Sequence, residues 1–138
     1  MFKQIALAIA FAGTFAIAAQ AQTPSPEGAK VYFIEPANGA EISGPVTVKF
    51  GLSGMGVAPA GTEKKHTGHH HILINQKLES YEDSIPADET HKHFGGGQTE
   101  AKLDLPAGTH TLQLVLGDQN HIPHKPPVES EVITITVK

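Results

Sequence analysis

Histidine is the residue type in this sequence whose number and spacing point most directly to chemistry. The chain has nine histidines and no cysteine. Imidazole nitrogen is a ligand that both Zn²⁺ and Cu²⁺ accept, so closely spaced histidines are a candidate metal site. Six of the nine stand in three close pairs, each beside or inside an apolar segment. The predicted ligand pool is His69 with His71, His91 with His93, and His121 with His124.

The first pair enters the apolar, β-branched segment 69–75. Alternate residues of a strand face the same way, so His69 and His71 are expected to project side by side. The second pair has the same spacing, and Pro123 stiffens the loop of the third pair. Loops at one end of a β-sandwich meet in space. We therefore predict that three or four of the six imidazoles converge on one copper or zinc ion.

The other three histidines have structural interpretations. His110 is in phase with the leucines that follow it, which favours a buried histidine hydrogen-bonded across a strand corner. His70 shares a face with Ile72 and Ile74 and is expected to face the core, although a one-residue slip would exchange the two faces. His66 lies in a Gly/Pro-rich loop and is interpreted as part of that loop only.

Residues near the pairs suggest how a metal site would be completed. Glu89, Glu100 and Asp118 are neighbouring carboxylates, and one of them is expected to accept the free N–H of a ligand histidine. The glycines 95–97 allow a sharp turn or a close approach of the backbone to another group. The alternative for the whole set is a group of solvated histidines in loops without a bound ion.

Short apolar segments separated by turn residues predict an all-β fold. Apolar and polar residues alternate in several of them, as half-buried strands require, and no segment indicates a helix of useful length. This pattern is typical of an immunoglobulin-like β-sandwich of about seven strands, here with His-rich loops at one end. The clearest strand segments are 31–34, 46–52, 69–75, 99–105, 110–116 and 128–138.

The first residues have the features of a secretory signal peptide. Lys3 precedes a nearly unbroken apolar run, and Ala19-Gln20-Ala21 is a small-residue cleavage motif. The alternative is a membrane anchor, but the run is short and rich in alanine. We predict a signal peptide at 1–21, a flexible leader at 22–29 and a single β-sandwich domain at 30–138. We expect cleavage of the signal peptide near Ala21. The mature chain is then periplasmic or secreted, and it has no membrane span.

Composition argues against several classes of partner. The formal charge is −4 at pH 7, and the chain contains no arginine. Bidentate phosphate recognition relies on arginine, so no nucleic-acid partner is predicted. Without cysteine the domain has no disulfide even in an oxidising compartment, so its apolar core, aided by a metal ion, must stabilise it.

Four segments of the sequence resemble an exported bacterial family known as domain of unknown function 4399. The resemblance implies a periplasmic location and one small β domain, and it brings no established activity. The opening EPANGAEISGPVTVKF is also similar to bacterial immunoglobulin-like modules, including small periplasmic copper carriers, which is an analogy of fold only. The four segments are VYFIEPANGAEISGPVTVKFGLSGMGVAPAG, TGHHHILIN, HKHFGGGQTE and LPAGTHTLQLVLGDQNHIPHKPPVESEVITITV.

Three functional hypotheses follow from the sequence. The first is a periplasmic copper- or zinc-binding protein that buffers, carries or senses the ion. The second is a metalloenzyme on the same scaffold, such as a copper-dependent redox enzyme similar to superoxide dismutase. Its ion would keep one coordination position open to solvent. The third is a non-catalytic envelope or adhesion module in which histidines serve hydrogen bonding or a response to pH.

Overall fold

The computed structural model describes residues 8–16 and 21–138. Its described residues contain strands and no helix, as the alternating pattern predicts. Seven strands have three or more residues, and two short ones, β2 and β4, have two. The strands are β1 (Lys30–Glu35), β2 (Glu41–Ile42), β3 (Val46–Ser53), β4 (Gly56–Val57), β5 (Thr67–Ile74), β6 (His91–His93), β7 (Glu100–Leu103), β8 (Gly108–Gly117) and β9 (Ile133–Val137).

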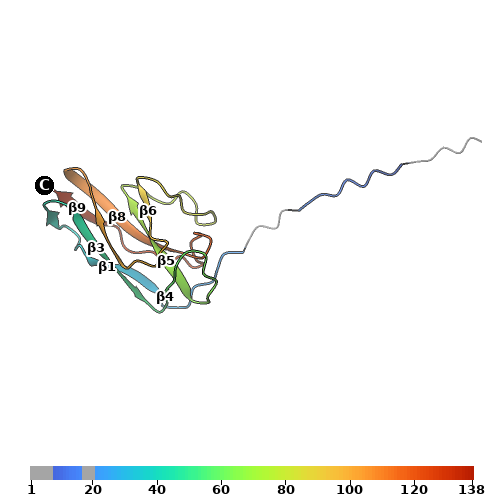
Figure 1. The fold of residues 1–138 in the computed structure, drawn as a ribbon, viewed down its shortest axis with the longest axis horizontal. Helices are drawn as coiled ribbons and strands as arrows, with labels where there is room; N and C mark the ends of the chain where they lie inside the picture. Colours follow the sequence, from blue (N-terminus) through green and yellow to red (C-terminus); the bar gives the residue numbers. More distant parts are fainter. Residues whose placement is uncertain (1–7, 17–20) are drawn as a thin grey trace, which may run out of the picture.

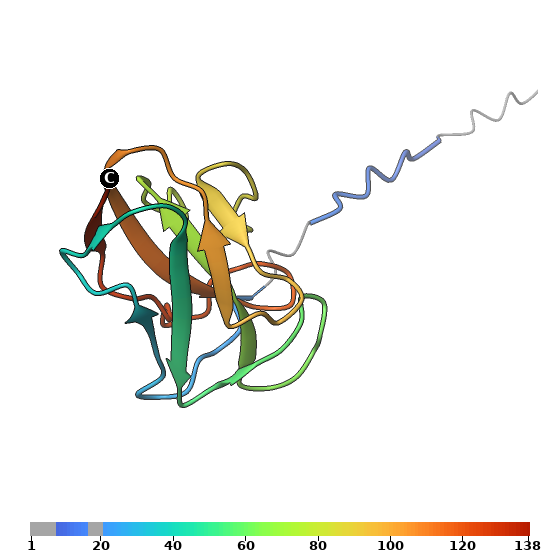
Figure 2. The same cartoon turned by 60° about the vertical axis from the view of Figure 1, so that its left-hand side comes forward.

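The strands form two sheets that face each other (Figure 1). One sheet has the order β1-β3-β7, and the other has the order β2-β9-β8-β5-β4, with β6 also pairing with β5. Figure 2 shows β3 and β7 side by side in front of β8. Among the seven longer strands, the first, second and fifth are in one sheet, and the third, fourth, sixth and seventh are in the other. Apart from the fourth strand, β6, which pairs with β5, this division matches the two sheets of the immunoglobulin sandwich, so the predicted fold class is confirmed.

The core lies between the sheets and is made by one face of each long strand. Ile72 and Ile74 of β5 and alternate leucines of β8 are buried against Val46 and Val48 of β3. His70 belongs to the same face of β5, and its ring lies on Phe50 with the centroids 4.9 Å apart. The expectation that His70 faces the core is therefore confirmed.

The other face of β5 is covered as well. Leu73 and Val115 pack with Ile85, which comes from the segment 75–90 between β5 and β6. This segment forms no strand or helix and lies over the outer face of the second sheet. As a result every residue of β5 after Thr67 is buried, which agrees with the unbroken apolar run Ile72–Ile74 and differs from a half-buried strand.

The N-terminal residues divide into two parts. Residues 8–16 have no regular secondary structure and are exposed, and the predicted cleavage motif lies partly outside the described residues. Within the predicted leader 22–29, by contrast, the backbone of residues 23–25 forms hydrogen bonds with Lys125. The structure thus differs from a free leader, because these residues are paired with a loop of the domain. In the described part of the chain, no helix is long and apolar enough to cross a membrane.

Candidate metal centre

The outer face of β5 carries the first two histidines of the centre. His69 and His71 alternate with His70, so they point away from the main core. In the antiparallel pairing of β5 with β6, His71 lies directly opposite His93. Side chains directly opposite one another in a sheet are close neighbours. The register of this one short strand pair therefore brings three imidazoles together.

The fourth histidine comes from the loop after β8. His69 lies opposite Gly117, the last residue of β8, and the chain then turns back so that Pro123 forms a bridge with Gly117. His121 stands within this turn with a φ of 65°. Few residues with a side chain adopt that left-handed conformation, and those that do are commonly held by their surroundings at functional sites. The turn directs the ring of His121 onto His69 and His93.

The four side chains offer one ligand nitrogen each, and these nitrogens all lie within 4.8 Å of one another. His69 Nε2 is 2.9 Å from His71 Nε2 and 3.0 Å from His121 Nδ1. Two nitrogens bound at about 2.0–2.1 Å to the same ion lie about 2.8–3.4 Å apart for bond angles between 90° and 109°. The spacing and the donor type therefore fit a zinc or copper ion.

Burial and neighbouring imidazoles keep three of the four rings in the form that binds metal. Burial first, and then the neighbouring imidazoles, lower the pKa of His71 to about 2. Burial, followed by His121 and His93, lowers the pKa of His69 to about 4, against an opposing contribution from Asp118. Burial and His121 also lower the pKa of the more exposed His93. Neutral imidazole is the metal-binding species, so these rings need lose no proton at neutral pH.

Two glycines leave room for the rings. A Cβ atom at Gly117 would lie 2.7 Å from His71 Nε2, and one at Gly95 would lie 2.6 Å from His93 Nε2. Both distances are shorter than carbon–nitrogen contacts allow. The prediction that residues 95–97 permit a close approach of the backbone is confirmed at Gly95. The role of Gly117 was not visible from the sequence, because it depends on the pairing of β5 with β8.

The His121 loop is held by hydrogen bonds from two other segments. The carbonyl oxygens of three consecutive residues in this loop each accept a hydrogen bond. Gly61 N donates to Gln119, Ser84 Oγ to Asn120, and Ile85 N to His121, at 3.1, 2.9 and 2.8 Å. Hydrogen bonds between separate loops cannot be predicted from the spacing of residues in the sequence. They fix the backbone from which the fourth histidine of the cluster projects.

Asp118 is the carboxylate that the structure places beside the cluster. Its side chain is buried and accepts hydrogen bonds at Oδ1 from the backbone N–H groups of Asn120 and Ile122, at 2.8 and 3.0 Å. Asp118 thus supports the backbone on both sides of His121. His71 Nδ1, however, is buried without a hydrogen-bond partner, so that histidine lacks the carboxylate or carbonyl that usually orients a ligand ring.

The other two members of the predicted ligand pool lie outside the four-histidine cluster. His91 Nδ1 is 2.8 Å from Asp88 Oδ1 at the surface. His124 is fully buried, and its Nε2 donates to the carbonyl of Thr67 at 3.2 Å, at the start of β5. The structure therefore gathers His69, His71, His93 and His121 and places His91 and His124 in separate contacts.

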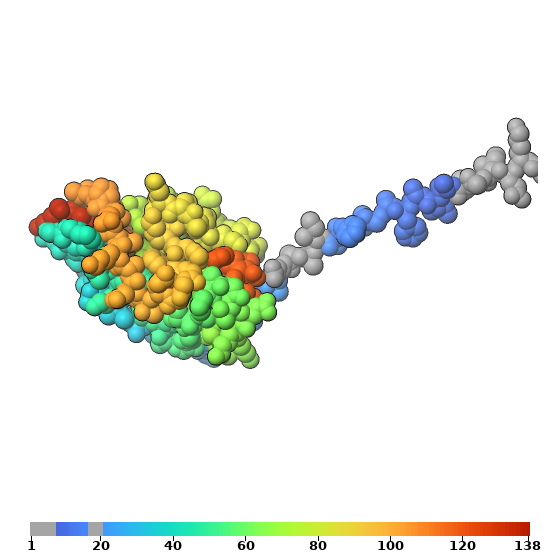
Figure 3. Space-filling view, viewed as in Figure 1, coloured from blue at the N-terminus to red at the C-terminus, as the bar shows by residue number. Residues whose placement is uncertain are grey.

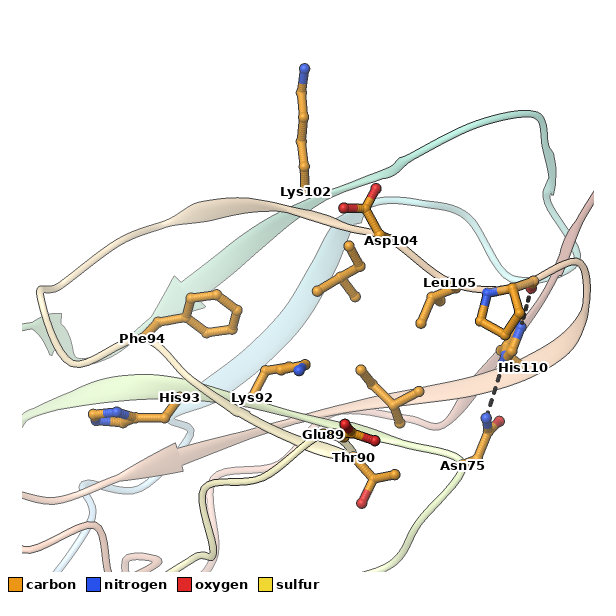
Figure 4. Close-up of a pocket in the computed structure, with 13 residues that line it drawn as sticks. Asn75, Glu89, Thr90, Lys92, His93, Phe94, Lys102, Asp104, Leu105 and His110 are labelled. Carbon is orange, nitrogen blue, oxygen red and sulfur yellow. Dashed lines mark hydrogen bonds between the residues drawn. The ribbon is translucent and has the colours of Figure 1, made fainter.

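His110 has the structural role that the sequence predicts. Its Nε2 donates to the carbonyl oxygen of Pro106 at 2.7 Å, and its Nδ1 lies 3.0 Å from Asn75 Nδ2. These contacts join the start of β8 to the end of β5. Figure 4 shows them at one end of a groove of about 690 Å³ between β6 and β7. His93 lies at the other end of the groove with its ring turned away from it, so the groove is separate from the cluster.

Comparison with solved structures gives three matches of low identity. The endo-β-1,4-mannanase from Thermotoga petrophila matches 80% of this chain at 21% identity with a TM-score of 0.45, and the match spans only 20% of the mannanase. The Clostridium thermocellum CbhA fibronectin(III)-like modules match 78% of this chain and 95% of theirs at 10% identity, with a TM-score of 0.41. CopC from Methylosinus trichosporium OB3b matches 78% of this chain and 93% of its own at 19% identity, with a TM-score of 0.38. At these scores the matches carry no argument about function.

No functionally curated protein matches the chain. A family model does match, over residues 48–138, which include β5, β6, β8 and all four histidines of the cluster. The description of that family is "Domain of unknown function (DUF4399)", and it confirms the resemblance found in the sequence. The chain is a member of this family.

Proposed function

We propose that this protein binds one copper or zinc ion through His69, His71, His93 and His121, and that it buffers or carries the ion in the periplasm or outside the cell. The observation that supports this function is the convergence of four imidazole nitrogens within 4.8 Å of one another. A set of neutral nitrogen donors without thiolate suits Zn²⁺ and Cu²⁺, and Cu²⁺ binds such sites more tightly than Zn²⁺.

The exposure of the four rings supports exchange of the ion rather than permanent burial. His69 and His71 are fully buried at the base of the site, whereas His121 is half-buried and His93 is exposed. A competing ligand from solvent or from another protein reaches the ion first from the side of His93. Such a one-sided opening suits a carrier that accepts and releases its ion.

Calorimetric titration with Cu²⁺ and Zn²⁺ tests the proposal, using protein purified without a polyhistidine tag. We expect one equivalent of ion to bind, with Cu²⁺ the tighter of the two. The electron paramagnetic resonance spectrum of the Cu²⁺ form should show coordination by four nitrogens. Absence of stoichiometric uptake of either ion would overturn the proposal. Catalytic consumption of superoxide by the Cu²⁺ form would instead favour a redox enzyme.

A further inference from the structure

The residues just after the predicted cleavage motif are attached to the loop that carries His121. We name Gln22–Ser25 the N-terminal strap. Pro24 forms a parallel bridge with Lys125, in which Lys125 N donates to Thr23 O at 3.0 Å and Ser25 N donates to Lys125 O at 3.1 Å. Figure 3 shows the loop, in orange-red, between the yellow and green segments and close to the blue N-terminal residues of the domain.

Side chains of the strap add contacts at both of its ends. The amide nitrogen of Gln22 donates to the carbonyl oxygens of Tyr81 and Pro123. At the other end, Ser25 Oγ donates to Pro126 O at 2.7 Å. Between them, Thr23 Oγ1 donates to Asp118 Oδ2 at 2.7 Å. The strap therefore follows the loop along most of its length.

The contact of Thr23 with Asp118 differs from the rest, because it continues to a metal ligand. Asp118 is 2% exposed, and its second oxygen accepts the N–H groups of Asn120 and Ile122. These two N–H groups belong to the residues on either side of His121, whose left-handed backbone must be held by its surroundings. A buried carboxylate with all its hydrogen bonds in place has one orientation, and loss of one donor frees it to rotate.

We infer that the strap is part of the metal centre and that Thr23 is a positioning residue, which acts through Asp118 on His121. The inference rests on the proposed function, since it assigns a role in holding the same ion. The other three ligands are on β5 and β6, which the strap does not contact through any hydrogen bond in the described structure. The strap should therefore control one ligand of four. Cleavage after Ala21 would leave all the strap contacts in place.

The test compares three single substitutions in the strap, made in protein that is exported and processed from its own leader. Thr23→Val keeps the shape of the side chain and removes the hydroxyl, whereas Thr23→Ser keeps the hydroxyl. Ser25→Ala is the matched control, because it removes one hydroxyl contact of the same strap that does not reach Asp118. Mass spectrometry of each protein confirms that the chain starts at the same residue.

We expect Thr23→Val to raise the Kd for Cu²⁺ by about 10-fold or more, the range for loss of a group that orients a ligand. The Cu²⁺ spectrum of this variant should change from four coordinating nitrogens toward three. Thr23→Ser and Ser25→Ala should stay within about twofold of the unsubstituted protein. A general loss of strap contacts would affect Ser25→Ala equally, so equal weakening in the two variants would overturn the role of Thr23.

Amide hydrogen exchange separates failure of this inference from failure of the proposed function. Thr23→Val should speed exchange at Asn120 and Ile122 in the metal-free protein, and Ser25→Ala should not. If the unsubstituted protein binds no ion, the proposed function is wrong, and exchange still decides whether the strap holds the loop. If it binds the ion and Thr23→Val has the same Kd and spectrum, only the strap inference is overturned.

Discussion

Both faces of β5 carry histidine, but the surroundings of the side chains differ between the two faces. On the inner face, His70 lies on Phe50 within the apolar core, and both its ring nitrogens are buried without hydrogen-bond partners. On the outer face, His69 and His71 meet His93 and His121 at distances that fit a shared ion. All three neighbours in sequence are fully buried. Burial and residue type therefore do not distinguish the candidate metal ligands from a core histidine here; the face of the strand does.

Substitution of the outer-face histidine should give the largest effect on metal binding. His71→Gln removes a ligand at the base of the site, and we expect the Kd for Cu²⁺ to rise by more than about 100-fold, above the range for groups that only orient a ligand. His70→Leu on the inner face is the matched control and should leave the Kd within about threefold. Titration calorimetry measures both. A loss of binding in His70→Leu similar to that in His71→Gln would contradict the division between the faces.

Crowding of the outer face without removal of any ligand should give the next effect. Gly117→Ala places a methyl group 2.7 Å from His71 Nε2, so the ring must move. We expect the Kd for Cu²⁺ or Zn²⁺ to rise by about 10–100-fold, comparable with the loss of a group that orients a ligand. In the control, Gly56→Ala, the added methyl group lies 3.6 Å from Thr67 Cγ2, an ordinary contact, and the affinity should not change.

The inner-face histidine should be visible in the acid stability of the metal-free protein. Burial lowers the pKa of His70 from 6.5 to about 4. The unfolded chain therefore binds this proton first as the pH falls, and stability declines from about pH 6.5 down to about pH 4. At pH 4.5 the loss attributable to His70 is about 2–3 kcal/mol relative to pH 7.5.

His70→Leu removes that share of the pH dependence and also removes two buried nitrogens without partners, which should stabilise the fold by about 1–3 kcal/mol at pH 7.5. Urea unfolding of both proteins at pH 7.5 and 4.5 measures the difference. An equal decline in the two proteins would show that His70 does not contribute, and would assign the acid sensitivity to the outer-face histidines, of which His69 has a pKa of about 4.

The smallest effect on metal affinity is expected for His91, which is on β6 with His93 but lies outside the four-histidine cluster. His91→Gln removes the surface contact with Asp88 and none of the four converging nitrogens. The Kd for Cu²⁺ should stay within about twofold, whereas His93→Gln on the same strand should weaken binding by more than about 100-fold. Similar losses in the two variants would place His91 among the ligands.

Local patterns predicted the fold and part of the site. Alternation along the strand placed His70 toward the core and its two neighbours on the opposite face. His110 was assigned a structural role because it is in phase with the leucines that follow it. Both predictions depend only on residues along one strand. The choice between His91 and His93 depends on the register of β5 with β6, which the spacing within one segment does not encode. The choice between His121 and His124 depends on the left-handed turn at His121 and on contacts from two distant segments.

The loop between β8 and β9 supplies one of the four converging imidazoles, His121, which is 52 residues away in sequence from His69 on β5. In an extended chain these donors are far apart, so the ion has its full set of nitrogens only after the sheet has formed. Metal binding should then follow folding and reinforce it, by about 2.7 kcal/mol when free ion is at 100 times the Kd. A chain that crosses a membrane unfolded would arrive empty and load in the compartment where it folds. Unfolding by heat would separate the four imidazoles and release any bound ion in the same step.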